Sequence, residues 1–122
     1  MIPVAIDAVR PRRILIVDDS RDNRELLQIM LNWEGFVTVL AGSGEEALAS
    51  VASAPPDVVL LDLGLPGLSG CDVTTQLKAD VATSGIPIVI ISGRDDDVTR
   101  KRLLAAGAAD FLVKPIDRAD LC

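Results

Sequence analysis

Residues 58–67 read Val-Val-Leu-Leu-Asp-Leu-Gly-Leu-Pro-Gly, and the fold of the whole chain is organised around this stretch. An apolar run of this length, followed by turn residues, predicts a strand that is buried on both faces. Asp62 then stands at the carboxyl end of the strand, where the sheet meets solvent. A carboxylate in that place is either a turn residue or part of a functional site, and the other strands decide between the two.

Short apolar runs of the same kind recur along the chain and alternate with helical spacing. Further strands are predicted at residues 14–17, 36–40, 88–91 and 110–113. Helices are predicted between the strands, over residues 20–33, from 43 to the prolines at 55 and 56, over 70–81, and from 95 to the glycine at 107. This alternation predicts an α/β fold, a doubly wound five-stranded parallel sheet with helices on both faces.

The chain of 122 residues is long enough for one domain with a real core. Residues 1–12, which include Pro3 and Pro11, predict an irregular lead-in, and residues 13–122 the domain itself. Its last helix, after Asp117, has barely begun at Cys122. One face of the sheet is therefore expected to be covered only in a longer protein or in a homodimer.

Composition excludes several classes of function. The balance of 12 basic and 18 acidic residues gives a net charge of −6, which argues against nucleic-acid binding by this chain. No stretch approaches the roughly 18 apolar residues that span a bilayer, and no signal peptide is recognisable, so a cytoplasmic protein without membrane contact is expected. Cys71 and Cys122 are too few for a disulfide framework or a zinc site. The chain has no histidine, which excludes histidine-based catalysis and metal ligation within it.

Polar residues follow most of the predicted strands at their carboxyl ends. The first strand leads into Asp18 and Asp19, the third ends at Asp62, the fourth at Ser92 and the fifth at Lys114. In an open parallel sheet, functional groups gather at this edge. Crowded carboxylates repel each other unless a cation joins them, and oxygen ligands favour Mg²⁺. Together with a lysine and a hydroxyl, they indicate phosphoryl transfer.

The same residues carry a family resemblance. The chain resembles the receiver domain of bacterial two-component response regulators, the CheY-like superfamily, from about residue 13 to 120. The resemblance lies in Val-Asp-Asp-Ser (17–20), Leu-Leu-Asp-Leu-Gly-Leu-Pro-Gly (60–67), Ile-Ser-Gly (91–93) and Phe-Leu-Val-Lys-Pro (111–115). It implies the flavodoxin-like strand order 2-1-3-4-5, here with a truncated last helix.

The resemblance implies a role for each aspartate at the strand ends. Asp62 is the implied phosphoacceptor, which becomes an aspartyl phosphate in a phosphorelay. Mg²⁺ is then the implied cofactor, bound by Asp18, Asp19, Asp62 and the backbone carbonyl of Gly64. Phosphorylation and dephosphorylation are self-catalysed in this picture, so the domain is a signalling phosphoacceptor rather than an enzyme.

The resemblance also implies how the phosphoryl group is sensed. Lys114 pairs with a phosphoryl oxygen, Ser92 moves in to hydrogen-bond the group, and Phe111 rotates inward behind it. The implied phosphodonor is a histidine kinase or a histidine phosphotransfer protein. The implied reader is an output domain or target protein, which contacts the face formed by the fourth helix and the fifth strand.

Simpler structural interpretations stand beside these roles. Asp18 or Asp19 can cap the helix near Ser20, Ser92 can cap the helix that follows it, and Phe111 can be ordinary core. The charged segment 94–102 is either a solvated helix face or a partner surface. Within the first helix, the side chains expected to pack on one side are Leu26, Leu27, Met30 and Trp33.

Two other functions remain as alternatives. One is a Mg²⁺-dependent phosphatase with an aspartyl nucleophile, but such enzymes typically carry a second acid where this chain has Gly64. The other is a pseudo-receiver that serves only as an interaction module. The intact set of acidic residues together with Lys114 argues against it.

Overall fold

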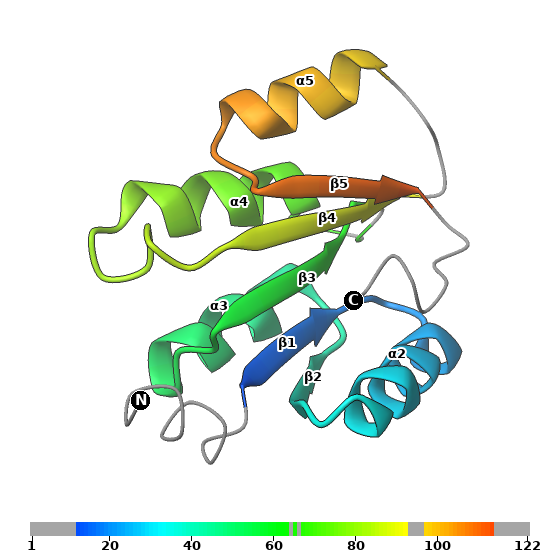
Figure 1. Cartoon of the computed structure of the whole chain (residues 1–122). Helices are drawn as coiled ribbons and strands as arrows, with labels where there is room; N and C mark the ends of the chain where they lie inside the picture. The colour runs from blue at the N-terminus through cyan, green and yellow to red at the C-terminus, as the bar shows by residue number, and fades with distance from the viewer. Residues whose placement is uncertain (1–11, 64, 66, 93–96, 114–122) are drawn as a thin grey trace, which may run out of the picture.

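The structure is a computed structural model that describes residues 12–63, 65, 67–92 and 97–113. Five parallel strands form one sheet in the order β2-β1-β3-β4-β5 (Figure 1). The strands are β1 (Arg13–Val17), β2 (Val37–Ala41), β3 (Val58–Asp62), β4 (Ile88–Ser92) and β5 (Asp110–Val113). The α/β class, the parallel sheet and the order 2-1-3-4-5 are thereby confirmed.

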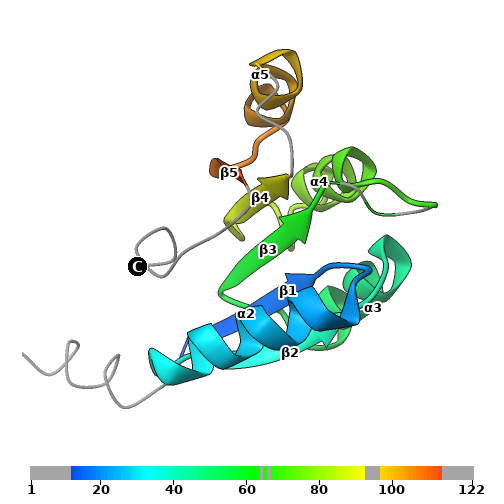
Figure 2. The same cartoon turned by 90° about the vertical axis from the view of Figure 1, so that its right-hand side faces the viewer.

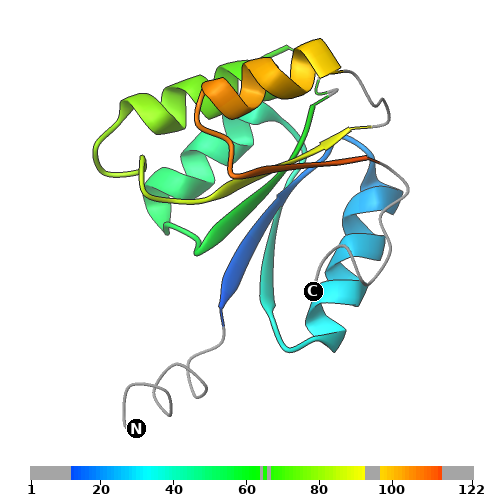
Figure 3. The same ribbon diagram turned by 45° about the horizontal axis from the view of Figure 1, so that its top comes forward.

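Helices cover both faces of the sheet, as predicted. They are α2 (Arg21–Trp33), α3 (Gly44–Ser53), α4 (Gly70–Ala79) and α5 (Asp97–Ala105). Figure 3 shows α3, α4 and α5 on one side of the sheet and α2 on the other, and Figure 2 shows α3 and α4 from a second direction. Within the described residues, the α2 face is thus covered by one helix.

The central strands β1, β3 and β4 are mostly apolar because they lie between helices on the two faces of the sheet. In β1, Leu15 and Val17 pack in the core shared with α3 and α4, whereas Ile14 and Ile16 pack in the core beneath α2. This alternation follows from the period of two in a strand. Each fully buried aliphatic side chain contributes about 1.5–3 kcal/mol of transfer free energy, which holds the central strand between the layers.

Helix α2 faces the sheet with a side that shares Leu27 with the predicted one but is rotated away from Leu26 and Trp33. Leu27 and Leu31 are buried, whereas Leu26 is 56 % exposed and Trp33 is 78 % exposed. Neighbouring helical positions point about 100° apart, so burial of Leu27 and Leu31 turns Leu26 and Trp33 toward solvent. The expected packing of Leu26 and Trp33 was therefore wrong. The helix carries more apolar residues than its contact with Ile14, Ile16 and Leu60 can cover.

Helix α4 ends at Ala79, before the predicted end at Val81. Asp80 is the C-cap in extended conformation, and its carboxylate accepts a hydrogen bond from the Ala82 amide at 2.9 Å. The Thr83 hydroxyl donates to the Leu77 carbonyl at 2.6 Å. These turn contacts replace the next helical hydrogen bonds, and Val81 is left 92 % exposed.

Part of the predicted architecture lies outside the described residues. This applies to most of the lead-in (1–11), the expected helix start at 95–96, and the segment 114–122 with the incomplete last helix. On the α2 side of the sheet, the described apolar side chains line a hollow of about 310 Å³. It is bordered by Ile14, Leu31, Val58, Leu60, Val89 and Leu112. Among the described helices, none is long and apolar enough to cross a bilayer.

Candidate functional site

The strand register places three polar residues side by side at the carboxyl edge of the sheet. Val17 pairs with Leu61, so Asp18, the residue after β1, lies level with Asp62 on the neighbouring strand. On the other side Asp62 pairs with Ile91, so Ser92 stands one residue further along β4. Asp62 is therefore flanked by Asp18 and Ser92, as adjacent strands lie only about 4.8 Å apart. All arrowheads in Figure 1 point toward this edge.

Three carboxylates converge at this edge. One oxygen each of Asp18, Asp19 and Asp62 lies within 4.8 Å of the other two. Asp18 is 2 % exposed and Asp62 is 7 % exposed, whereas Asp19 is open to solvent. Carboxylates this close in a partly desolvated place repel each other strongly. Oxygen-only ligands around a point that solvent can reach fit a hard cation such as Mg²⁺, which keeps part of its water shell.

Asp18 is held by several hydrogen bonds. Its amide donates to the Ala41 carbonyl at 3.1 Å, and its carboxylate accepts from the Ser20 amide at 2.9 Å. Its carbonyl accepts from Arg24 Nη1 at 2.6 Å. The N-cap of α2 is Ser20, whose hydroxyl accepts from the Asn23 amide. Neither aspartate is the N-cap of α2, so the simpler interpretation of this pair is wrong.

The loop that follows Asp62 is fastened at both ends. The Leu63 amide donates to the Ile91 carbonyl at 2.9 Å, which continues the ladder past Asp62. Further along, the Leu68 amide donates to Glu45 Oε1 at 3.2 Å, so the first turn of α3 holds the loop from the side. Ser69 then begins α4 with a complete capping box. Gly64, the predicted carbonyl ligand, lies outside the described residues.

Ser92 and Phe111 are both buried, and each has an exposed fraction of 6 %. Their strands, β4 and β5, lie on the side of β3 opposite to β1 and Asp18. Phe111 pairs with Ile90 across the β4–β5 ladder. The guanidinium carbon of Arg100, on α5, lies 5.2 Å from the centre of the Phe111 ring, within the range of a cation–π contact. The proposed switch residue thus joins α5 to the sheet. Lys114, which follows β5, lies outside the described residues.

Three contacts that sequence reasoning missed join residues that no helical or strand period relates. Arg24 reaches back to Asp18, Glu45 reaches across to Leu68, and Arg100 lies on Phe111. Each of these charged residues lies where a solvent-exposed residue of a helix is expected, so the local sequence gives no indication of its contact. The structure brings together Asp18, Asp19 and Asp62.

Comparison with known proteins points to one family. A family model described as the response regulator receiver domain matches residues 14–122. The chain is 44 % identical over 116 residues to the DNA-binding response regulator MtrA of Mycobacterium tuberculosis, which covers 95 % of this chain and 49 % of MtrA. It is 39 % identical over 109 residues to protein PilH of Pseudomonas aeruginosa, which covers 89 % of this chain and 90 % of PilH. The chain thus spans about half the length of MtrA and most of PilH.

Solved structures show the same fold. Chemotaxis protein CheY4 of Vibrio cholerae superposes with a TM-score of 0.87 at 27 % identity, over 92 % of this chain and 93 % of that one. A putative response regulator from Chloroflexus aurantiacus superposes with a TM-score of 0.87 at 32 % identity, over 92 % of each chain. Both likenesses extend over nearly the whole chain.

Proposed function

Because this chain belongs to the response regulator receiver domain family, we propose that it accepts a phosphoryl group on Asp62 and passes the signal on by a change of conformation. The observation that carries the proposal is the acidic cluster of Asp18, Asp19 and Asp62 at the carboxyl edge of the sheet. The proposed donor is a histidine kinase or a histidine phosphotransfer protein. Since the sequence has no histidine, the phosphohistidine belongs to another molecule or domain.

In the proposed reaction a carboxylate oxygen of Asp62 attacks phosphorus in line. The O–P bond forms while the P–N bond to the imidazole of the donor breaks. The Ser92 hydroxyl, on the neighbouring strand, donates a hydrogen bond to a phosphoryl oxygen, and Lys114 offers its ammonium group to another. The fixed position of Asp62 between two paired strands favours attack, because a held nucleophile loses little orientational freedom in the transition state.

Asp18, Asp19 and Asp62, with the Gly64 carbonyl, are the proposed ligands of Mg²⁺. When bound, the ion offsets the negative charge of the carboxylates and of the phosphoryl oxygens. The exposure of Asp19 leaves one side of the cluster open to water and to the incoming donor. The buried position of Asp18 and Asp62 strengthens their attraction to a cation, because screening by solvent is reduced there.

The proposed output surface is formed by α5 and β5. Phosphorylation favours a population in which Ser92 and Phe111 are drawn toward Asp62, and the contact between Phe111 and Arg100 carries the change to α5. Val98 is 69 % exposed and Leu104 is 42 % exposed, so α5 offers apolar contact area to an output domain, a target protein or a second copy of the chain.

The first prediction concerns metal removal. Incubated with Mg²⁺ and acetyl phosphate, the chain is expected to gain the mass of one phosphoryl group, because the cation offsets the charge that otherwise repels the donor. With excess EDTA the gain should disappear. Intact-protein mass spectrometry at short times measures both. Absence of the adduct with Mg²⁺, while a known receiver domain is labelled in parallel, would falsify the proposed function.

The second prediction concerns Trp33, the sole tryptophan of the sequence. It ends α2, a helix of 13 residues, so it lies about 20 Å along the helix axis from the end next to the cluster. It is also 78 % exposed. Saturating Mg²⁺ is therefore expected to leave its fluorescence emission unchanged. A clear spectral shift would contradict this. Leu63→Trp in a Trp33→Phe background, beside Asp62, should respond and serves as the positive control.

A further inference from the structure

We infer that Arg24 is a positioning residue for the cation site, an inference that rests on the proposed function. It acts on the backbone of a proposed ligand residue rather than as a ligand. Arg24 lies one turn into α2, where its amide donates to the Ser20 carbonyl at 3.0 Å. From there its side chain reaches back to the carbonyl of Asp18 at 2.6 Å. A guanidinium donor at this distance makes a strong, charge-assisted hydrogen bond.

This hydrogen bond completes the set that holds Asp18. The amide of Asp18 is bound to Ala41 on the neighbouring strand, and its carboxylate is bound to the Ser20 amide. The carbonyl is the remaining backbone group, and Arg24 binds it. With amide, carboxylate and carbonyl all engaged, the segment from Asp18 to Asp19 is held in one conformation before a cation arrives. Groups that orient metal ligands in this way typically change metal affinity by about 10-fold or more when they are removed.

The space next to Gly42, which has no side chain, is occupied by the Arg24 guanidinium. A Cβ atom at Gly42 would lie 3.1 Å from Arg24 Nη1, and 3.5 Å from Glu46 Oε2. The Gly42 amide donates to that same Glu46 oxygen at 2.6 Å. The lack of a side chain at Gly42 therefore leaves room for the Arg24 guanidinium beside the Asp18 carbonyl.

The charge of Arg24 and its hydrogen bond to Asp18 predict opposite effects on Mg²⁺ affinity when Arg24 is replaced. A cation near three carboxylates opposes the binding of Mg²⁺ by Coulomb repulsion, so removal of its charge alone should tighten Mg²⁺ binding. Removal of a positioning hydrogen bond should weaken binding, because the ligand segment must then be ordered when the ion binds. The sign of the change therefore separates the two roles.

The experiment is a Mg²⁺ titration of the whole chain, followed by amide chemical shifts, with Arg24→Met, Arg24→Lys and Arg21→Met compared with wild type. Arg21 is the matched control, since it lies on the same helix, carries the same charge and pairs with Glu25 at 3.0 Å on the exposed surface. Arg24→Met should weaken Mg²⁺ binding by about 10-fold. Arg24→Lys, which keeps a cationic donor, should recover most of the affinity. Arg21→Met should match wild type or bind slightly more tightly.

Gly42→Ala is the second test, and it decides the outcome if Arg24→Met does not fold. It leaves every charge in place and places a Cβ against Arg24 Nη1, so it should also weaken Mg²⁺ binding. Unfolding by urea in EDTA checks that each variant is folded. Equal or tighter binding by both Arg24→Met and Gly42→Ala overturns the inference while Mg²⁺ binding by wild type stands. If wild type itself shows no saturable binding, the proposed cation site and the inference fail together.

Discussion

Asp62→Asn is expected to abolish phosphoryl incorporation from acetyl phosphate in the presence of Mg²⁺. The amide is close in size to the carboxylate, so the end of β3 should keep its fold, but it offers no anionic oxygen to attack phosphorus. Asp62 pairs with Ile91 and is 7 % exposed, so the asparagine should keep the position of the aspartate. Intact mass before and after incubation measures the loss.

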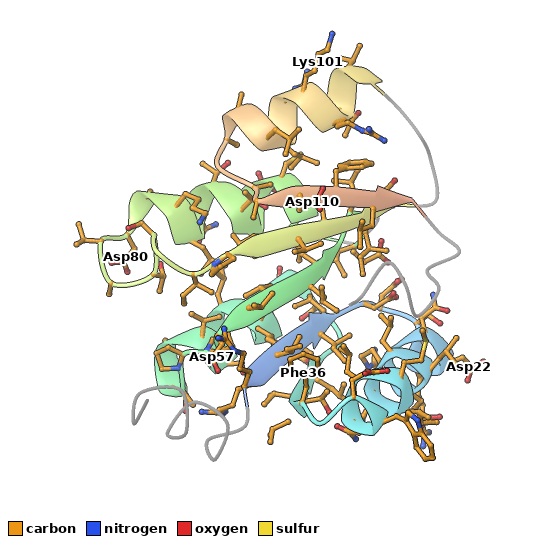
Figure 4. The ribbon with its side chains drawn as sticks, viewed as in Figure 1. Asp22, Phe36, Asp57, Asp80, Lys101 and Asp110 are labelled. Carbon is orange, nitrogen blue, oxygen red and sulfur yellow. The ribbon has the colours of Figure 1, made fainter. Side chains whose placement is uncertain are left out.

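Asp80→Asn is the matched control for that experiment. Asp80 lies at the opposite end of the molecule from the acidic edge, as Figure 4 shows, and its carboxylate accepts a hydrogen bond from the Ala82 amide in the turn after α4. This variant should be phosphorylated as wild type is. Undiminished labelling of Asp62→Asn would contradict the assignment of the phosphoacceptor, and peptide mapping would then identify the residue that carries the group.

Gly44→Ala is expected to destabilise the fold by about 1–3 kcal/mol, the range for an overpacked core position. A Cβ atom at Gly44 would lie 2.7 Å from the Leu68 carbonyl oxygen and 2.8 Å from Val73 Cγ2. Neither atom moves easily, because one belongs to the backbone and the other to a fully buried side chain. Helix α3 would have to shift away from the loop that follows Asp62.

Urea unfolding at equilibrium measures the change, with Gly85→Ala as the control. A Cβ at Gly85 meets no atom within 4 Å, so that variant should stay within about 0.5 kcal/mol of wild type. If both variants unfold at the same urea concentration as wild type, the close packing of α3 on the loop does not limit stability, and the prediction is wrong. Phosphorylation of Gly44→Ala should also slow, because Leu68 and Glu45 fasten that loop.

Much of the fold could be predicted from local pattern. Strands such as β3 are short, mostly apolar and followed by turn residues, and α3 follows a serine N-cap, Ser43, whose hydroxyl accepts from the Glu46 amide. These signals depend on neighbours in the chain. Boundaries were less accurate where a turn competed with a helix, as at Asp80, since the Thr83 hydroxyl and the Asp80 carboxylate end α4 early.

The candidate site was predictable only in outline. Carboxyl ends of parallel strands align, so acidic residues after β1 and β3 had to approach each other once the strand order was right. Their spacing within 4.8 Å depends on the register of Val17 with Leu61, which no single segment specifies. The contribution of Arg24 was invisible, because its partner is a backbone carbonyl that helical spacing does not reveal.

By itself, the sequence determined the alternation of strands and helices and the set of residues at the ends of the strands. Both follow from the periodicity of apolar side chains and from turn chemistry, which act over a few residues. Only the tertiary structure decided which side of α2 is buried, how α3 holds the loop after Asp62, and what holds Asp18 in place. The first two outcomes are set by contacts between segments that are far apart in the chain. Arg24 and Asp18 are only six residues apart, but the contact between a guanidinium and a backbone carbonyl depends on how the side chain turns back, which the sequence pattern does not reveal.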